Sequence, residues 1–504
     1  MLPPDPSAPR EPLRRRLQQA SFAVAIAGLV AVVALYASGG FVVSVLGVEI
    51  RAHRPLRALW LFALGAVAFV ALGGRFSDAR SNPAAAFREL LAAWERHVRP
   101  RLPSPQRTAI AVALTVVAIG AVFGTKSAGG ADSHGYVSQA TEIWLAGRLF
   151  IDQPFVTDVP WPNANETFAP LGYKAVLHDG VPALVPTYSP GLPLLFAAVK
   201  AIAGWDAMYF VGPILGGVLV LSTYSIGRRF CSPGAGLIGA LLVASSPAVL
   251  FMLMPPMTDV PVAAMWAASF CLLMGHSSGH AFAAGLTSAI AILIRPNLAP
   301  LAAIAGAYYL PELLRRESRG LGIRRVLLFG FGLFPGVLAV AALNDIWYGS
   351  PLLSGYGRLS DLFSWSHIAP NAWRYLTWTL ETQTPVALLG VLALLLPARW
   401  LWPGVDERRR VVAAALFVVF VFAQYLAYLV FDAWWYLRFV LTAWPFMMVG
   451  VGAVAMAAWR QGGGAVRFVV VSAVGAVLLF QVGIVRDKPI FDQWSGERRY
   501  IAVA

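Results

Sequence analysis

Four ionisable residues stand at the ends of strongly apolar segments, where their side chains could do chemistry. Two are acids, Asp132 and Asp259, and two are bases, Arg295 and Arg438. An ionised group near hydrocarbon costs roughly 2.5–3.5 kcal/mol on insertion scales. We therefore expect Asp259, Arg295 and Arg438 to share a cavity or to bind something charged. For any one Arg taken alone, the alternative is a membrane anchor whose charged end reaches the headgroups.

The composition identifies the chain as a membrane protein. Of 504 residues, 58% are apolar and 13% are charged. We predict an all-α polytopic fold with about 13 transmembrane helices of roughly 20 residues each. A net charge of +14 would suggest nucleic acid in a soluble protein, but here the Arg residues cluster in alternate short loops, so no nucleic-acid partner is expected. The candidate spans cover residues 21–47, 57–73, 108–125, 208–226, 235–254, 260–275, 281–294, 297–310, 326–343, 384–398, 411–431, 437–458 and 467–485.

The Arg clusters also orient the chain. The positive-inside rule places the N-terminus in the cytoplasm and the C-terminus outside, in a multi-pass protein of a bacterial plasma (inner) membrane. Three parts are predicted: two N-terminal helices with a basic cytoplasmic loop (1–107), a transmembrane core (108–460) and a last helix with a short extracytoplasmic tail (461–504). The core contains a large extracytoplasmic loop, residues 126–207, which ends in a short helix predicted to lie in the headgroup plane.

The large loop has the composition of a polar cavity at the outer surface, since acids outnumber bases and Trp and Tyr are interleaved. Tyr136, Ala140, Ile143 and Trp144 recur at helical spacing, which predicts an amphipathic helix starting directly after Asp132. Asp132 would then be its N-cap, and capping alone would account for an Asp there. Elsewhere, the glycines at 330, 332 and 336 lie in an apolar span and are expected to permit close helix packing.

Several short motifs, spread from about residue 108 to 460, resemble those of the membrane glycosyltransferases of the C superfamily. The most similar branch contains the protein mannosyltransferases and the lipid A aminoarabinose transferase-like enzymes. The motifs are Ala131-Asp132-Ser133-His134-Gly135-Tyr136, Tyr188-Ser189-Pro190-Gly191, Thr258-Asp259-x-Pro261, Ile294-Arg295-Pro296, Trp347-Tyr348-Gly349-x-Pro351 and Tyr436-Leu437-Arg438-Phe439.

The resemblance implies transfer of a hexosyl or pentosyl group from a polyprenyl-phosphate donor to an extracytoplasmic acceptor, by a single displacement with inversion. The acceptor would be a protein, lipid A or a cell-envelope glycan. Asp132 is then the expected general base, Asp259 a second acid, and Arg295 and Arg438 the ligands of the donor phosphate. The candidates for acceptor or sugar binding are His134, Glu166 and Tyr188.

One departure from the family concerns metal use. Ser133 stands where many relatives carry a second acid next to the first, so participation of a divalent cation is left open. The main alternative to a transferase is a transporter or flippase of lipid-linked saccharides. Such a protein is expected to show internal hydropathy repeats and interrupted helices with polar residues near the midplane, and neither is clear in this sequence. A third hypothesis is a ligase or polymerase that joins preassembled glycans.

Overall fold

The computed structural model describes residues 41–45, 48–52, 55–71 and 103–494 apart from residues 397 and 403, together with Ser21, Val24 and Gly28. The chain forms two compact units. The first contains residues 1–104 and 455–484, and the second contains residues 105–454 and 485–504. All the residues predicted to do chemistry belong to the second unit.

The described part of the first unit contains a hairpin and apolar helices. Strands β1 (Phe41–Val45) and β2 (Val48–Ala52) pair antiparallel, with Phe41 opposite Ala52. Helix α2 (Pro55–Ala71) follows, and α21 (Gly464–Asp487) lies largely in this unit. The end of the predicted span at 21–47 is therefore wrong, because its β-branched residues favour a strand. The rest of that span lies outside the described residues, apart from Ser21, Val24 and Gly28.

The described residues contain six helices long and apolar enough to cross a membrane, or up to eight if two bent pairs each count as one span. The protein is thus an α-helical polytopic membrane protein, but the predicted count of 13 is not confirmed. Besides α21, the spans contain α4 (Pro105–Phe123), η5 (Trp205–Phe210) with α8 (Val211–Phe230), α15 (Arg319–Tyr348), α19 (Val405–Leu426), and η8 (Trp434–Ala443) with α20 (Trp444–Gln461).

Proline accounts for much of the difference from the predicted spans, because its ring cannot continue a preceding helix. The breaks within the bent pairs precede Pro247 and Pro385. Proline also divides the predicted span at 297–310 into η6 (Pro296–Leu298), α13 (Leu301–Ala307) and α14 (Leu310–Leu314). The bent pairs are α9 (Pro233–Ala244) with α10 (Pro247–Leu253), at 57°, and η7 (Trp365–His367) and α17 (Ile368–Gln383) with α18 (Val386–Leu395), at 118°.

Two shorter apolar helices, α11 (Asp259–Leu273) and α12 (Ser278–Ile294), pack in the centre of the second unit. Glycine allows α12 to lie close against α15. A Cβ at Gly332 would overlap the carbonyl oxygen of Phe282, and one at Gly336 would lie 2.7 Å from Ala289. The expected close packing is confirmed for these two glycines, whereas Gly330 faces open space.

The large loop begins with helix α5 (Ala131–Gln139), which continues as a π-helical turn, η3 (Ala140–Leu145). The helix starts earlier than predicted. Its N-cap is Gly130, and Asp132 lies inside the first turn. The predicted capping role of Asp132 is therefore wrong, and capping does not account for this carboxylate.

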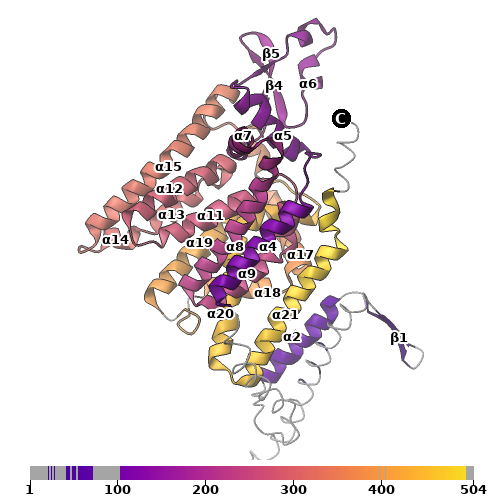
Figure 1. Cartoon of the computed structure of the whole chain (residues 1–504), viewed down its shortest axis with the longest axis vertical. Coiled ribbons are helices and arrows are strands. Elements are labelled where there is room, and N and C mark those ends of the chain that lie inside the picture. Colours follow the sequence, from indigo (N-terminus) through magenta and orange to yellow (C-terminus); the bar gives the residue numbers. More distant parts are fainter. Residues whose placement is uncertain are drawn as a thin grey trace, which may run out of the picture. The chain divides into compact units, whose positions relative to one another are not determined.

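A small sheet follows, which the all-α prediction did not include. Strands β3 (Ile151–Asp152), β5 (Val181–Pro186) and β4 (Tyr173–His178) pair antiparallel in that order. The β4–β5 turn is Asp179-Gly180, with φ of 49° and 82°, a dipeptide that favours tight hairpins. Together with η4 (Pro154–Asp158) and α6 (Ala164–Thr167), the sheet stands beyond the end of the helices where α5 and α7 (Gly191–Ala203) lie (Figure 1).

The close approach of α12 and α15 can be tested with two glycines of the same helix. We expect Gly332→Leu to lower the free energy of unfolding by about 1–3 kcal/mol, because overpacking forces the two helices apart. Gly330→Leu is the control, since a side chain there meets open space. Thermal unfolding of the purified protein in detergent measures both, and equal melting temperatures for the two variants would contradict the packing described.

Candidate active site

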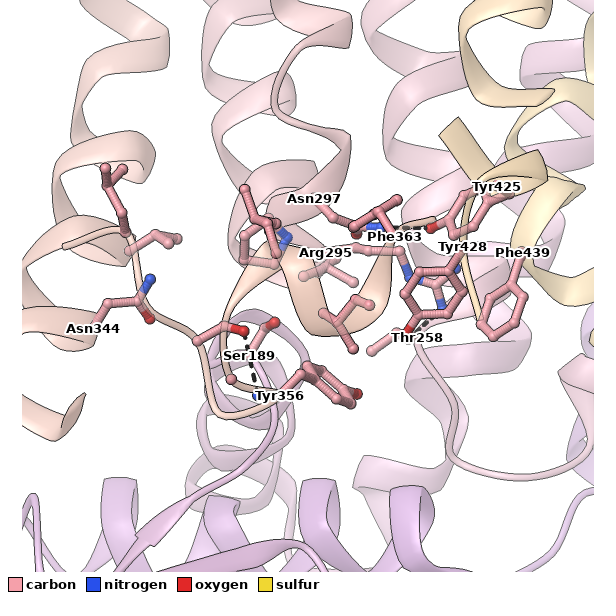
Figure 2. Close-up of a pocket in the computed structure, with 18 of the residues that line it drawn as sticks. Ser189, Thr258, Arg295, Asn297, Asn344, Tyr356, Phe363, Tyr425, Tyr428 and Phe439 are labelled. Carbon is pink, nitrogen blue, oxygen red and sulfur yellow. Dashed lines mark hydrogen bonds between the residues drawn. The ribbon is translucent and has the colours of Figure 1, made fainter. Parts of the chain in front are cut away.

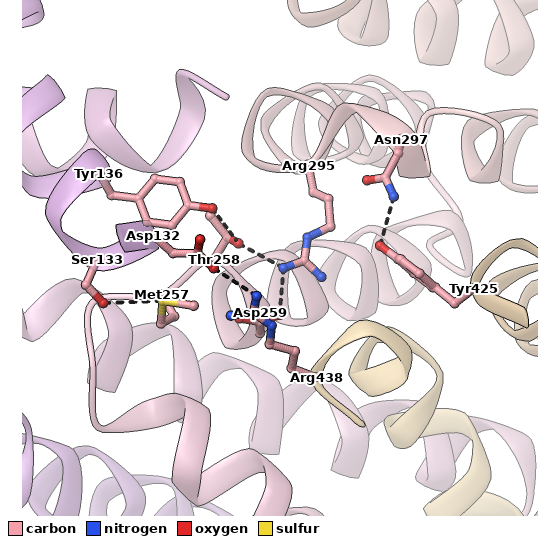
Figure 3. Close-up of polar contacts among 10 residues, drawn as sticks. All are labelled: Asp132, Ser133, Tyr136, Met257, Thr258, Asp259, Arg295, Asn297, Tyr425 and Arg438. Carbon is pink, nitrogen blue, oxygen red and sulfur yellow. Dashed lines mark hydrogen bonds and ion pairs between the residues drawn. The ribbon is translucent and has the colours of Figure 1, made fainter. Parts of the chain in front are cut away.

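The structure brings the four ionisable residues together from four separate elements (Figure 3). Asp132 lies in the first turn of α5, and Asp259 begins α11. Arg295 directly follows α12, and Arg438 lies in η8. Nη2 of Arg438 is 2.8 Å from Oδ2 of Asp132, and Nη2 of Arg295 is 2.6 Å from Oδ1 of Asp259. The charges thus form two ion pairs at one site.

Helix ends place these side chains. Pro255 and Pro256 separate α10 from α11, so that Asp259 starts a new helix and its negative charge lies at the positive end of the helix dipole. Pro296 ends α12 at Ile294, because the residue before a proline is disfavoured in the helical conformation. Arg295 accordingly has an extended backbone, with φ of −147°.

The Asp259–Arg295 pair is the more buried of the two. The side chain of Asp259 has no exposed surface, and that of Arg295 is 13% exposed. Nη2 of Arg295 also donates to Oγ1 of Thr258 at 2.9 Å, and the Tyr136 hydroxyl lies 3.4 Å from the same oxygen. Burial, followed by the charge of Asp132, raises the pKa of Tyr136 well above its ordinary range. Tyr136 is therefore a neutral phenol beside the pair.

Asp132 is more accessible than Asp259. Its side chain is 28% exposed, and that of its partner Arg438 is 16% exposed. Tyr188 is buried nearby, within range of the Asp132 charge. Burial and the negative charge of Asp132 raise the pKa of Tyr188 well above its ordinary range, so Tyr188 stays a neutral phenol. Asp132 thus has a cation as its partner and a neutral phenol nearby.

Two buried donors of the arginines are left over. Nη1 of Arg295 and Nε of Arg438 have no hydrogen-bond partner within the part of the chain that the structure describes. A buried donor without a partner is costly, and a native structure usually supplies one with a bound ligand, ion or water. The aromatic rings of Tyr436 and Phe439, whose centroids are 5.3 and 5.2 Å from Arg438, cover part of its guanidinium group. Oδ2 of Asp259, a buried acceptor, also has no partner among the described residues, so the site has two unused donors and one unused acceptor.

A cavity of about 300 Å³ opens beside the pairs (Figure 2). Asp132 and Arg295 contribute to its wall, and the other polar or aromatic residues of the wall are uncharged. Those labelled in Figure 2 besides Arg295 are Ser189, Thr258, Asn297, Asn344, Tyr356, Phe363, Tyr425, Tyr428 and Phe439.

The site lies at the ends of helices whose opposite ends carry the Arg clusters. In α19, Arg408 to Arg410 lie near the start, whereas Tyr425 near the end lines the cavity. In α15, which begins at Arg319, it is Asn344 near the end that lines the cavity. Arg410 donates to the carbonyl of Arg229 at 2.8 Å, so the clusters of α8 and α19 meet each other. Cavity and Arg clusters thus lie at different ends of the helices.

The other predicted site residues are placed differently. Tyr188 lies near Asp132, but the lining of the cavity includes none of Tyr188, His134 and Glu166. A ring nitrogen of His134 lies 2.8 Å from the carbonyl oxygen of Leu171, and Glu166 is exposed on α6. Asp259 lies behind Arg295 rather than in the cavity wall.

Part of the site was missed by the sequence analysis. Nδ2 of Asn297 donates to the Tyr425 hydroxyl at 2.9 Å, and both residues line the cavity together with Tyr428. The loop after α15 supplies Ser354 and Tyr356. Tyr425 and Tyr428 fell inside a predicted span, where aromatic residues near a helix end indicate a membrane interface. The only signal for the loop was the motif at 347–351, which immediately precedes it.

The residues described here do not assemble an evident cation site. Among them there is no group of three or more His, Cys, Asp or Glu side chains that could hold a metal ion. Asp132 and Asp259 each face a guanidinium group instead of each other. The sequence left participation of a divalent cation open, and it stays open.

Comparison with known proteins gives a likeness only at the level of structure. No protein-family model matches the chain, and no curated protein matches it. Similar solved structures include ArnT from Cupriavidus metallidurans bound to undecaprenyl phosphate (13% identity, TM-score 0.48) and the same protein in the apo state (14%, 0.47). Each alignment covers 78% of this chain and 77% of that one.

Another similar structure is the Archaeoglobus fulgidus oligosaccharyltransferase in complex with zinc and sulfate. Its identity is 14% and its TM-score 0.42, and the alignment covers 62% of this chain and 45% of that one. Identities this low assign no role to any single residue of this chain.

The buried Asp259–Arg295 pair generates a stability prediction. Asp259→Leu leaves a buried guanidinium group without its counter-ion, so we expect the free energy of unfolding to fall by about 3–5 kcal/mol. The double variant Asp259→Leu, Arg295→Met removes both charges and should recover most of that loss. Thermal unfolding in detergent measures both variants, and a double variant no more stable than the single one would argue against the pair.

Proposed function

We propose that this protein is a glycosyltransferase that moves a hexosyl or pentosyl group from a polyprenyl-phosphate donor to an extracytoplasmic acceptor. The observation that carries the proposal is one cavity whose wall contains a partly exposed carboxylate, Asp132, and a guanidinium group, Arg295, while Arg438 pairs with Asp132 outside that lining. The order of the sequence motifs, which resemble those of such transferases, supports the same function.

In this proposal, Arg295 and Arg438 bind the phosphate of the carrier lipid. A guanidinium group binds phosphate through charge-assisted hydrogen bonds, and its fixed geometry suits bidentate contacts. Nη1 of Arg295 and Nε of Arg438 are the donors that have no acceptor among the described residues. When the bond between the sugar and the phosphate breaks, negative charge grows on the phosphate oxygen, and the same cations stabilise it.

Asp132 acts as the general base. The acceptor hydroxyl or amine attacks the anomeric carbon and passes its proton to a carboxylate oxygen of Asp132. The electron pair of the bond between that carbon and the phosphate oxygen leaves with the phosphate, which gives inversion at the anomeric carbon. A general base contributes about 10²–10⁴ in rate. Arg438 orients the carboxylate, and the neutral Tyr188 phenol lies near it.

Asp259, expected from the sequence as a second acid, is assigned a positioning role. Its carboxylate is fully buried and is bonded to Arg295, so it fixes the guanidinium group rather than meeting the substrate. The same guanidinium nitrogen, Nη2 of Arg295, also donates a hydrogen bond to Oγ1 of Thr258 at 2.9 Å. Arg295 therefore does not have to be ordered when the carrier phosphate binds.

The proposed side of the membrane is the extracytoplasmic one, with the N-terminus in the cytoplasm of a bacterial cell and the C-terminus outside. The Arg clusters lie at the helix ends away from the cavity, and such clusters favour the cytoplasmic side. A donor borne on a lipid suits an enzyme that works where nucleotide sugars are not available. The acceptor is a protein, lipid A or a cell-envelope glycan.

The base assignment predicts the behaviour of Asp132→Asn. The amide keeps the shape of the side chain but cannot take a proton, so we expect release of polyprenyl phosphate to slow by about 10²-fold or more. The assay uses the reconstituted protein, a polyprenyl-phosphate sugar and candidate acceptors. Asp158→Asn is the matched control, because Asp158 is an exposed acid of the same loop.

Three outcomes separate the alternatives. Release of polyprenyl phosphate with sugar on the acceptor, lost in Asp132→Asn at unchanged expression, supports the transferase and its base. Full turnover by Asp132→Asn would show that the catalytic assignment is wrong. Movement of intact donor across the membrane without cleavage would instead identify a transporter or flippase.

A further inference from the structure

Apart from Asp132 and Arg295, which the proposed function uses as base and phosphate ligand, the wall of the cavity carries no charge among the described residues. The remaining polar groups are hydroxyls and amides, which donate and accept hydrogen bonds without bearing charge. They belong to Tyr136, Ser189, Thr258, Asn297, Asn344, Ser354, Tyr356, Tyr425 and Tyr428.

The size of the cavity limits what it can hold. At about 300 Å³ it lies at the lower end of the range for small-molecule sites, which is roughly 300–1,000 Å³. A preassembled oligosaccharide would need a considerably larger space. The volume thus favours a single sugar residue as the group that is transferred.

Hydrogen bonds and close packing hold the loop after α15, which forms one side of the cavity wall. Nδ2 of Asn344 donates to the carbonyl of Pro351 at 3.2 Å, and the backbone N–H of Tyr356 donates to Oγ of Ser354 at 3.3 Å. A Cβ at Gly355 would overlap the backbone of Thr187, so only glycine allows the loop to lie this close. The uncharged wall is therefore part of the folded structure and is not assembled by the ligand.

We propose that the sugar donated at this site is a single uncharged monosaccharide, a hexose or pentose without an amine or a carboxylate. The proposal rests on the transferase function. An ammonium group would need a carboxylate partner, because burying an unpaired charge is unfavourable. Asp132 is the only carboxylate in the described wall; it is already paired with Arg438, and it must stay free of the sugar to take the acceptor's proton.

A uronic acid is disfavoured for the complementary reason. Arg295 is the only cation in the described wall of the cavity, and the carrier phosphate requires it. A sugar carboxylate would compete for the same guanidinium group, and its charge would repel the phosphate beside it. Neutral hydroxyl groups of a sugar, in contrast, find both donors and acceptors in the wall.

The test compares polyprenyl-phosphate donors that differ only in the sugar: mannose, arabinose, 4-amino-4-deoxyarabinose and glucuronic acid. Release of polyprenyl phosphate by the reconstituted protein gives kcat/KM for each donor. We expect the neutral donors to exceed both charged donors by about 10²-fold or more, the scale of discrimination when a buried polar group is left unpaired.

A second test uses a variant that should gain an activity, because a gain cannot result from a failure to fold. Ser354→Asp places a carboxylate in the wall and still offers an oxygen to the Tyr356 N–H, since Asp forms the same kind of turn. It should raise the use of the amino sugar relative to arabinose by at least about 10-fold, a change that one charged pairing can supply. Ser354→Asn, similar in shape but neutral, should not.

Each result bears on one proposal or on both. Wild-type protein that uses a charged donor as well as the neutral ones would overturn the inference and leave the transferase function intact. Equal effects of Ser354→Asp and Ser354→Asn would also overturn it. Absence of polyprenyl-phosphate release from every donor and acceptor tried would contradict the proposed function itself, and the sugar inference with it.

Discussion

The ion pair between Asp259 and Arg295 is the interaction on which the site depends. Neither charge would be stable alone at this depth, because a buried charge requires a partner. The pair joins the start of α11 to the end of α12 across a 2.6 Å contact. It therefore fixes the relative position of two helix ends and presents the guanidinium group to the cavity. The second pair, between Asp132 and Arg438, joins the large loop to η8 in the same way.

Breaks in the helices allow the charged residues to meet outside the hydrocarbon region. A continuous apolar helix would carry Asp259 or Arg295 into hydrocarbon, whereas prolines end the helices where the charged residues stand. The loop after α15 then closes the cavity with uncharged side chains. Charge compensation explains the shared depth of the four residues, and the neutral wall leaves Asp132 and Arg295 as the charged groups that line the described cavity.

The helical membrane fold and the shared level of the four charged residues were predictable, because hydropathy and the cost of burying charge are local properties of the sequence. Which acid pairs with which base was not predictable, since Asp132 and Arg438 are far apart in the sequence and meet at 2.8 Å only in the folded chain. Asn297, Tyr356 and Tyr425 were missed because polar and aromatic residues near helix ends are common in membrane proteins. His134 and Glu166 matched or neighboured motifs, yet neither lines the cavity.

The central claim is that Arg295 and Arg438 recognise the phosphate of a polyprenyl carrier. The most direct measurement is the affinity of the reconstituted protein for polyprenyl phosphate relative to the uncharged polyprenol of equal length. We predict a preference for the phosphate of about 100-fold or more, which corresponds to roughly 2.7 kcal/mol, and a loss of most of it in Arg438→Gln. Equal affinities for the two lipids in the wild type, or an unchanged preference in the variant, would contradict this account.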